Sequence, residues 1–429
     1  MDLLLEKLDG RRYYLSQYKV LITDFEESAP SVTRNSKQLD QRNGNIDFGG
    51  WHTDKTINIT GYYRADDIDE EETLREKLYA LLSDPEGYYI TQLKTTPSVA
   101  MERPGETSGG YYDKLNDYPS HKRFLVYTEA PEMELVGNVN GTLLYKLTAE
   151  FKTMKLPYGE TPAVDIAIDS PNKDVPLNFA IASHASGSNT IWKDYYPIHM
   201  QLSEDLSGKT ITTTVKVIVT NYQGKMDTTN SIGPYIDVKD GVSTGNWEGL
   251  INQIPITGNG VYTSVPKTMT KHPLTGTANQ IDVEMYNLNA TIEVWVKLEL
   301  GTTASPWSPN PADPEYNSWY YSLVGNVSVP YSGSVPCNQL EQGFTVQFTA
   351  TGSASSLSFK IYDTELTYSG AVASGDVFMF SGFSYTQNGL SIVSKTNKAY
   401  FILQPDKPNR ITCNVPGTVR ILGFQNLYA

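Results

Sequence analysis

Apolar and polar residues alternate along most of this chain, with the period of two that is typical of β-strands with one buried face. In the first 160 residues, short segments of this kind are separated by turns and cover 13–22, 45–63, 87–92, 123–127 and 143–152. Two later groups follow, between 198 and 300 and between 343 and 424. The pattern predicts a mainly β chain built from antiparallel sheets.

One segment departs from the strand period and predicts a single helix over 70–83. Asp69 is the expected N-cap, and Glu72 stands at the third helical position. The acidic run 70–72 therefore indicates a helix start, where carboxylates suit the positive end of the dipole, rather than a metal site. The apolar positions form one stripe, which consists of Leu74, Leu78, Leu81 and Leu82.

The segment 292–315 indicates the end of a structural unit. Its alternating strand runs into Gly301 and then a proline-rich stretch. Proline cannot donate a hydrogen bond to a sheet, so the strand cannot continue, while Trp307 can pack back onto the sheet just completed. We therefore expect four parts: a first domain at 1–160, a linker or first part of the last domain at 161–182, an inserted domain at 183–316, and a last domain at 317–429.

Composition agrees with several β-sandwich domains. The length of 429 residues accommodates about three domains, and 29 Tyr and 33 Gly are typical of β-rich chains with many turns. The net charge of −14 repels phosphate, so we expect no nucleic-acid and no membrane partner, but protein or neutral glycan instead.

The amino terminus lacks the pattern of a signal peptide, and no apolar run approaches the roughly 18 residues of a membrane span. We therefore expect synthesis in a reducing cytosol. In that compartment Cys337 and Cys413 are expected to be buried free thiols rather than a disulfide.

Motifs for metal binding or catalysis are missing from the sequence. The five histidines are scattered, and there is no zinc pattern, nucleophile elbow, phosphate loop, dinucleotide fingerprint or EF-hand loop. We expect no catalytic residue, no metal and no cofactor. A glycosidase carboxylate pair leaves no spacing signal, so a hydrolase remains an alternative.

Aromatic residues suggest a saccharide site. Trp247 stands among loop-forming residues at 243–249, so its ring is hard to bury in a sheet, and an exposed Trp can stack on the apolar face of a sugar. Trp295 falls on a strand position and is expected to be structural. Ordinary packing at a sheet edge is the alternative for each of the expected binding residues, which are Trp247, Trp192, Tyr195, Tyr196, Tyr235 and Tyr262.

The first domain resembles the N-terminal belt domain of distal tail proteins from long-tailed phages of Gram-positive bacteria. The resemblance rests on LDGRRYY at 8–14, DQRNGNID at 40–47, the helix, and the strand 87–92. It implies a homo-hexameric ring at the virion tail tip, assembled in the host cytoplasm, that joins the tube of the major tail protein to the tail-associated protein.

The end of the chain resembles the C-terminal galectin-like domain of the same family, through VSVPYSG at 327–333, the segment 401–409, and VRILGFQNLY at 419–428. That domain commonly lacks a working sugar site in the family, so we expect no binding residue in 324–429. About 140 residues separate the two matched domains. The strand and Trp-x-Pro tail within 292–315 resemble the closing strand of jelly-roll carbohydrate-binding modules, which extended family members hold at such places.

These observations predict a mainly β protein with a belt domain carrying one helix, an inserted jelly-roll sandwich and a galectin-like sandwich. The first hypothesis is a structural, non-enzymatic baseplate hub whose inserted module binds host cell-wall polysaccharide. The second is a wall-glycan hydrolase with accessory β modules. A bacterial surface adhesin is disfavoured because the sequence shows neither signal peptide nor anchor.

Overall fold

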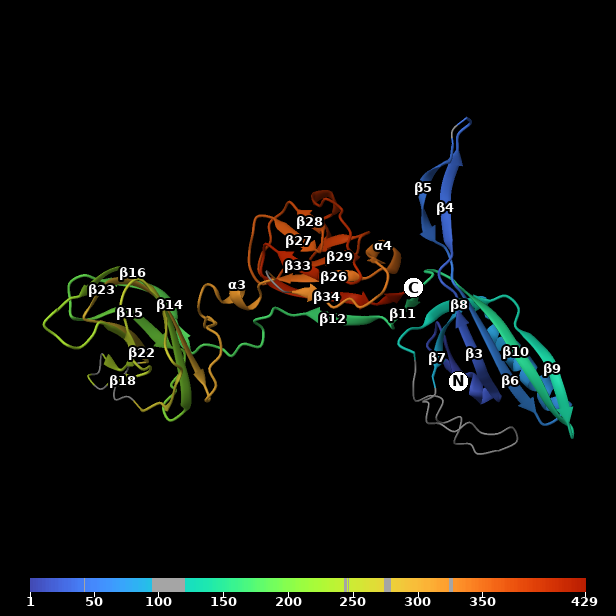
Figure 1. Cartoon of the computed structure of the whole chain (residues 1–429), viewed down its shortest axis with the longest axis horizontal. Coiled ribbons are helices and arrows are strands. Elements are labelled where there is room, and N and C mark those ends of the chain that lie inside the picture. The colour runs from blue at the N-terminus through green and yellow to red at the C-terminus, as the bar shows by residue number, and fades with distance from the viewer. Residues whose placement is uncertain (42, 95–119, 243–244, 246, 274–278, 324–326) are drawn as a thin grey trace.

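Three β-rich bodies lie in a row, with the N-terminal domain at one end, the C-terminal sandwich in the middle and the inserted sandwich at the other end (Figure 1). The computed structural model describes residues 1–41, 43–94, 120–242, 245, 247–273, 279–323 and 327–429. Strands dominate each body, which confirms the prediction of a mainly β chain. The glycine- and tyrosine-rich stretch 95–118 lies outside the described residues.

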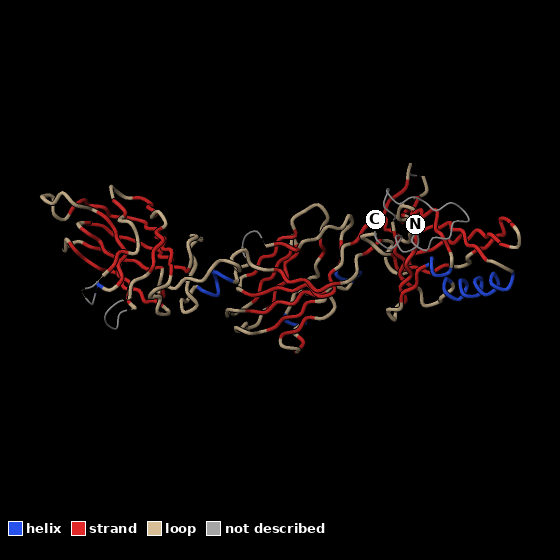
Figure 2. Tube along the Cα trace, turned by 90° about the horizontal axis from the view of Figure 1, so that it is seen from below, coloured by secondary structure: helices blue, strands red, loops and turns tan. Residues whose placement is uncertain are grey.

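The N-terminal domain is a sheet in the order β2-β1-β7-β8-β10-β6-β3, with β9 paired to β10. The helix α1 (Ile68–Leu82) packs beside this sheet (Figure 2). The short 3-10 helix η1 (Leu15–Tyr18) connects the first strands. The strands are β1 (Asp2–Lys7), β2 (Arg12–Tyr14), β3 (Val20–Glu27), β6 (Thr56–Ala65), β7 (Tyr88–Leu93), β8 (Phe124–Thr128), β9 (Glu132–Val139) and β10 (Thr142–Thr153).

The predicted leucine stripe of α1 is confirmed, because all four leucines are buried in the core of this domain. The predicted cap was wrong by two residues. Asp67, in extended backbone, accepts a hydrogen bond from the backbone N–H of Glu70 at 2.8 Å, so it is the N-cap. Asp69 lies inside the first turn, where its charge still suits the helix dipole.

A two-stranded hairpin, β4 (Val32–Gln38) and β5 (Asn45–His52), projects from the N-terminal domain (Figure 1). The strand predicted over 45–63 is therefore two strands, β5 and β6, with a break between His52 and Thr56. Val32, Phe48 and Trp51 on this hairpin are each more than half exposed. The hairpin pairs with no other strand of the described chain.

The inserted domain is a sandwich of two antiparallel sheets around a core of Val, Ile, Leu and Met. One sheet has the order β14-β23-β16-β20, with β21 also paired to β16. The other has the order β13-β15-β22-β17-β18, with β19 also paired to β17. The strands are β13 (Ala180–Ile181), β14 (His184–Asn189), β15 (Asp194–Leu202), β16 (Thr210–Lys225), β17 (Tyr235–Asp240), β18 (Glu248–Gly249), β19 (Ile254–Pro255), β20 (Gly260–Thr263), β21 (Lys267–Thr270), β22 (Gln280–Tyr286) and β23 (Leu288–Leu300).

Strands β13 to β17 alternate between the two sheets, whereas β18 and β19 stay in the sheet of β17, and β20 and β21 both join the other sheet. In each sheet an early strand lies beside a late one, β14 beside β23 and β15 beside β22. Because β13 pairs with β15, the sandwich begins before residue 183.

The C-terminal sandwich contains strands from both sides of the insertion. β12 (Val164–Ile168) pairs with β34 (Gly417–Phe424), so part of 161–182 belongs to this domain. Its sheets have the orders β12-β34-β26-β29-β30-β31 and β24-β33-β27-β28 around a Phe-rich core. Cys337 and Cys413 are both buried free thiols, as predicted. The remaining elements are β11 (Gly159–Glu160), α3 (Tyr316–Tyr320), β24 (Ser328–Val329), β25 (Cys337–Asn338), α4 (Gln339–Gln342), β26 (Thr345–Ala350), β27 (Leu357–Ile361), β28 (Thr364–Tyr368), β29 (Val377–Phe380), β30 (Tyr385–Gln387), β31 (Leu390–Ser391), η3 (Val393–Lys395), β32 (Ile402–Leu403), β33 (Asn409–Cys413) and β35 (Leu427–Tyr428).

Backbone hydrogen bonds join the N-terminal domain to the C-terminal sandwich. Arg123, next to β8, exchanges two backbone hydrogen bonds with Glu160 of β11, at 2.9 and 2.8 Å. β11 in turn pairs with β35 at the end of the chain. The two domains therefore share a short β ladder instead of a free linker.

A buried polar clasp closes the base of the inserted sandwich, where its incoming and outgoing segments meet. Asn178 donates to the carbonyl oxygens of Val296 at 2.7 Å and Ser308 at 2.9 Å. The Lys297 ammonium donates to Ser308 Oγ and to the carbonyl of Pro176. Burial lowers the pKa of Lys297 to about 8. These bonds satisfy buried polar groups and hold the two segments together.

Trp307 lies beside this clasp. Its indole N–H donates to Ser183 Oγ at 3.3 Å, and its ring meets the His184 ring edge-on at a centroid separation of 6.0 Å. The prediction that Trp307 packs back onto the completed sheet is thus confirmed.

Candidate saccharide-binding face

The outer face of the β15-β22-β17 sheet carries a cluster of charged and aromatic side chains. Ile236 and Val238 of β17 point into the core, so Tyr235 and Lys239, which alternate with them, point the other way. The same alternation places Glu284 on this outer face, beside the core residues of β22. Charged residues here are nevertheless buried, because they pack against one another and under neighbouring segments.

Lys239 and Glu284 form the centre of the cluster. Lys239 Nζ lies 2.8 Å from Glu284 Oε1, and the two side chains are only 6% and 2% exposed. The Tyr196 hydroxyl donates to the same carboxylate oxygen at 3.0 Å. Burial raises the pKa of the Glu284 carboxyl, and the hydrogen bond from Lys239 opposes that rise.

Trp247 lies over this centre. Lys239 Nζ is 4.1 Å from the centroid of the indole ring, within the range of a cation–π contact. Lys239 is itself fixed by Glu284, so it holds one face of the indole in place. The Trp247 side chain is still 53% exposed. Residues 243, 244 and 246 of the same loop lie outside the described part of the chain.

A pair of stacked tyrosines extends the face along the strands. Tyr235 and Tyr286 lie directly opposite each other on β17 and β22, with ring centroids 4.7 Å apart and planes at 10°. At the other end, Asp282 accepts a hydrogen bond from Gln280 at 2.6 Å and contacts His199 Nδ1 at 2.5 Å. The face therefore runs from stacked aromatic rings to a polar pair.

This arrangement suits a ligand rich in hydroxyl groups. Asp237 lies opposite Glu284 in the sheet register, and burial raises its pKa as well. Among the described residues, Glu284 Oε2 and Asp282 Oδ2 have no hydrogen-bond partner. Carboxylates outnumber Lys239 on this face, which disfavours phosphate and other anions, while exposed aromatic rings favour stacking.

The structure brings together only some of the residues expected to bind saccharide. Trp247 and Tyr196 both contact Lys239, and Tyr235 lies on the same face. Trp192 is 61% exposed, but it lies in the β14–β15 turn, where Asn189 holds its backbone. Tyr195, at the start of β15, is also partly exposed.

Tyr262 has a different environment. It lies on β20 of the opposite sheet and packs partly against the core. Its hydroxyl donates to the carbonyl of Gly258 at 2.9 Å and accepts from that residue's N–H at 3.0 Å. Hydrogen bonds from Thr257 and Gly258 lower the pKa of Tyr262. These contacts fix the neighbouring turn and favour a structural role.

Trp295 also lies on the opposite sheet, and its ring faces are covered. The His184 ring stacks on it at 4.6 Å, and Lys216 Nζ is 4.7 Å from its centroid. The strand pattern indicated this structural role. The sequence did not single out Lys239, Glu284 or Tyr286, because their proximity depends on which strands pair and in which register.

In the described ranges, no group of three or more His, Cys, Asp or Glu side chains could hold a metal ion. None of the helices described is long and apolar enough to cross a membrane.

The family model described as the phage tail protein RIFT-related domain matches residues 8–142. The N-terminal domain is therefore similar to this family of phage tail domains. The match confirms the resemblance of the first domain to siphophage tail proteins that the sequence indicated. No curated protein sequence matches the chain.

Solved structures that align with this chain come from the adsorption apparatus and baseplates of phages. The Dit protein of phage SPP1, described as a paradigm of the hub adsorption apparatus, is 10% identical, with 70% of this chain and 99% of that chain covered and a TM-score of 0.26. The phage P2 baseplate in its Ca-activated conformation gives 12% identity, coverages of 69% and 97%, and a TM-score of 0.28. The baseplate tripod of phage Tuc2009 is 13% identical, with 57% of this chain and 99% of that chain covered and a TM-score of 0.23.

Proposed function

We propose that this protein is a structural distal tail hub whose inserted sandwich binds the host cell wall. In this proposal the N-terminal domains form a ring of six between the tube of the major tail protein and the tail-associated protein. The inserted sandwich carries a face for cell-wall polysaccharide. The protein acts by assembly and adhesion and has no enzymatic role.

Exposed apolar side chains on the N-terminal domain support the ring. A lone two-stranded hairpin is marginally stable in water, yet β4–β5 projects with Val32, Phe48 and Trp51 exposed. Packing against a neighbouring subunit would bury these side chains and stabilise the hairpin. In a closed ring, every subunit would bury these side chains against its neighbour in the same way.

The single observation that carries the saccharide proposal is the position of Trp247. Lys239 occupies one face of the indole and is anchored by Glu284, while about half of the side chain stays exposed. Because Lys239 fixes one face of the indole ring, little conformational entropy is lost when a pyranose stacks on the other face. The partly buried Tyr196 hydroxyl, which donates to Glu284, can accept a hydrogen bond from a sugar hydroxyl.

Binding by one module is expected to be weak, with a Kd of about 0.1–1 mM, or about −4 to −5.5 kcal/mol. Weak sites are sufficient on a ring. Six copies that engage one repetitive polymer could exceed the single-site affinity by about two or more orders of magnitude.

The test is binding of the purified full-length protein and its variants to host cells and to isolated wall polysaccharide. Trp247→Ala should abolish binding while the mass and the melting temperature stay unchanged, because the residue lies outside the core. The control is Val261→Ala, which truncates an exposed side chain on β20 of the opposite sheet. If Trp247→Ala binds as well as the parent, Trp247 is not the platform; if the parent binds no wall fraction, the adhesive role fails and only the hub remains.

One observation supports the alternative that the protein is a hydrolase. Burial raises the pKa of both Glu284 and Asp237, which lie opposite each other on the paired strands β22 and β17. A general acid must be protonated near neutral pH and within reach of the glycosidic oxygen. The Lys239 contact instead favours the ionised form of Glu284. Release of reducing ends from labelled walls by the parent, lost in Glu284→Gln, would favour the enzyme.

A further inference from the structure

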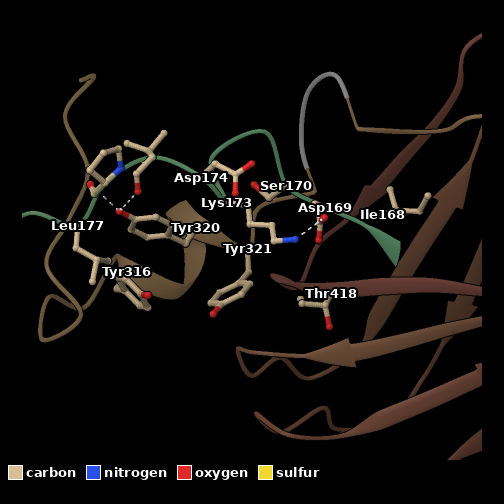
Figure 3. Close-up of a pocket in the computed structure, with 13 residues that line it drawn as sticks. Ile168, Asp169, Ser170, Lys173, Asp174, Leu177, Tyr316, Tyr320, Tyr321 and Thr418 are labelled. Atoms are coloured by element: carbon tan, nitrogen blue, oxygen red, sulfur yellow. Dashed lines mark hydrogen bonds and ion pairs between the residues drawn. The ribbon is translucent and has the colours of Figure 1, made fainter. Parts of the chain in front are cut away.

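A cavity lies at the junction between the inserted sandwich and the C-terminal sandwich, far in sequence from the Trp247 loop. It has a volume of about 380 Å³. Four separate segments line it: the end of β12 with the residues after it, the incoming segment 173–177, the helix α3, and the start of β34 (Figure 3). None of the residues that the sequence indicated as binding sites lies here.

Hydrogen bonds between these segments hold the cavity open. The Asn172 side-chain amide donates to the carbonyl of Trp319 at 3.0 Å. The Tyr320 hydroxyl donates to the carbonyl of Val175 at 3.0 Å, and the N–H of Gly417 donates to the carbonyl of Tyr321 at 2.9 Å. These bonds fix the walls to one another, which makes the pocket preformed.

Aromatic rings form one side of the pocket. Tyr316 and Tyr321 are both half-buried, with centroids 6.3 Å apart and planes at 81° (Figure 3). Tyr320 is buried behind them, and its ring centroid lies 4.7 Å from that of Tyr316. Two rings at nearly a right angle present a flat face and an edge to the same space. A flat ligand with C–H groups on one side can stack there.

Polar groups form the rest of the lining. Asp169 and Lys173 pair at 2.6 Å at the edge of the pocket, and Ser170, Asp174 and Thr418 add oxygen atoms (Figure 3). Two carboxylates against one ammonium leave this lining negative, so phosphate and acidic sugars are disfavoured. A purely apolar ligand would bury these oxygens without partners, which costs free energy.

We propose that this junction pocket binds a neutral pyranose unit, which stacks on Tyr321 or Tyr316 and donates hydroxyl hydrogen bonds to Asp169, Asp174 and Thr418. The volume admits one or two sugar rings. Because the pocket is lined by the segments that carry the insertion and by the C-terminal sandwich, the sugar contacts all of them at once. The site is separate from the proposed Trp247 face and does not depend on it.

The experiment is saturation-transfer NMR on the full-length protein with N-acetylglucosamine, glucose and galactose as probes. We expect transfer to at least one probe, with a Kd of about 1–10 mM. Tyr321→Ala removes the ring and keeps the backbone bond to Gly417, and it should weaken binding at least tenfold. Thr418→Val, which loses only the hydroxyl at nearly constant volume, should weaken it severalfold. Tyr400→Ala, a partly exposed tyrosine outside the pocket, is the matched control and should bind like the parent.

The outcomes separate this site from the Trp247 face. If Trp247→Ala removes all transfer while Tyr321→Ala and Thr418→Val leave it intact, the pocket is empty and the proposal is overturned. Absence of transfer from all three probes in the parent also overturns it. If transfer survives Trp247→Ala and is lost in the pocket variants, the pocket binds sugar even if the wall-adhesion proposal fails. Should Tyr321→Ala fail to fold, Thr418→Val decides.

Discussion

Replacing Lys239 with methionine should strongly destabilise the inserted sandwich. The ammonium lies 2.8 Å from Glu284 Oε1, and both side chains are almost fully buried. Methionine keeps most of the aliphatic stem but leaves the Glu284 carboxylate without a cation in a site that water does not reach. Removing one partner of a buried pair costs about 3–5 kcal/mol.

The cost should depend on pH with a defined sign. Burial raises the pKa of Glu284 above its ordinary value of 4.5. The folded state therefore keeps this proton to higher pH than the unfolded chain, and stability falls as pH rises from 4.5 through the folded pKa. Without Lys239 the folded pKa rises further. The stability difference between parent and variant should thus be smallest below pH 4.5 and largest near neutral pH.

The assay is hydrogen exchange of the β17 and β22 amides in the full-length protein, since these amides report the opening of this sandwich alone. The double variant Lys239→Met, Glu284→Gln is the control, because a neutral amide needs no cation and should recover most of the loss. A loss below about 1 kcal/mol at pH 7, the size typical of an exposed ion pair, would refute the reasoning that the pair is buried.

Three further predictions concern other parts of the molecule. Asp67→Ala should destabilise the N-terminal domain by about 1 kcal/mol in thermal melts, whereas Asp69→Ala should cost less than half of that, because only Asp67 caps α1; equal losses would contradict the assignment. The folded pKa of Lys297 near 8 lies below the unfolded value of 10.5, so stability should rise by about 3 kcal/mol between these pH values, and Lys297→Met should lack that part of the rise in pH-dependent urea unfolding. Deletion of 176–313 with a short Gly-Ser bridge should leave cooperative melting of the other two domains, and its loss would show a shared core.

The sequence predicted features that depend on local periodicity. The four leucines of α1 repeat at helical spacing, and the alternation in β23 placed Trp295 on a sheet surface before any contact was known. The N-cap of α1 was harder to predict, because Asp67 and Asp69 have the same side chain. Only the extended backbone at Asp67, which the sequence does not reveal, makes it the N-cap. The strand predicted over 45–63 breaks after His52, since the hairpin leaves the main sheet there.

The saccharide-binding face could be predicted only in part. Trp247 was found because loop-forming residues surround it, a signal that exists within a few positions of the chain. Lys239 and Glu284 meet because β17 pairs with β22, about 45 residues later in the sequence. No local sequence pattern predicts that pairing. The junction pocket has no such pattern either, because it is lined by residues near 170, 320 and 418 that are far apart in the chain.

The most direct test of the hub is the mass of the purified full-length protein in solution, measured by light scattering across concentrations, alone and with the neighbouring tail proteins. The account predicts a species of six times the 47.7 kDa chain mass, seen as a ring in negative-stain images. A monomer at every concentration, and also in the presence of the major tail protein and the tail-associated protein, would contradict it.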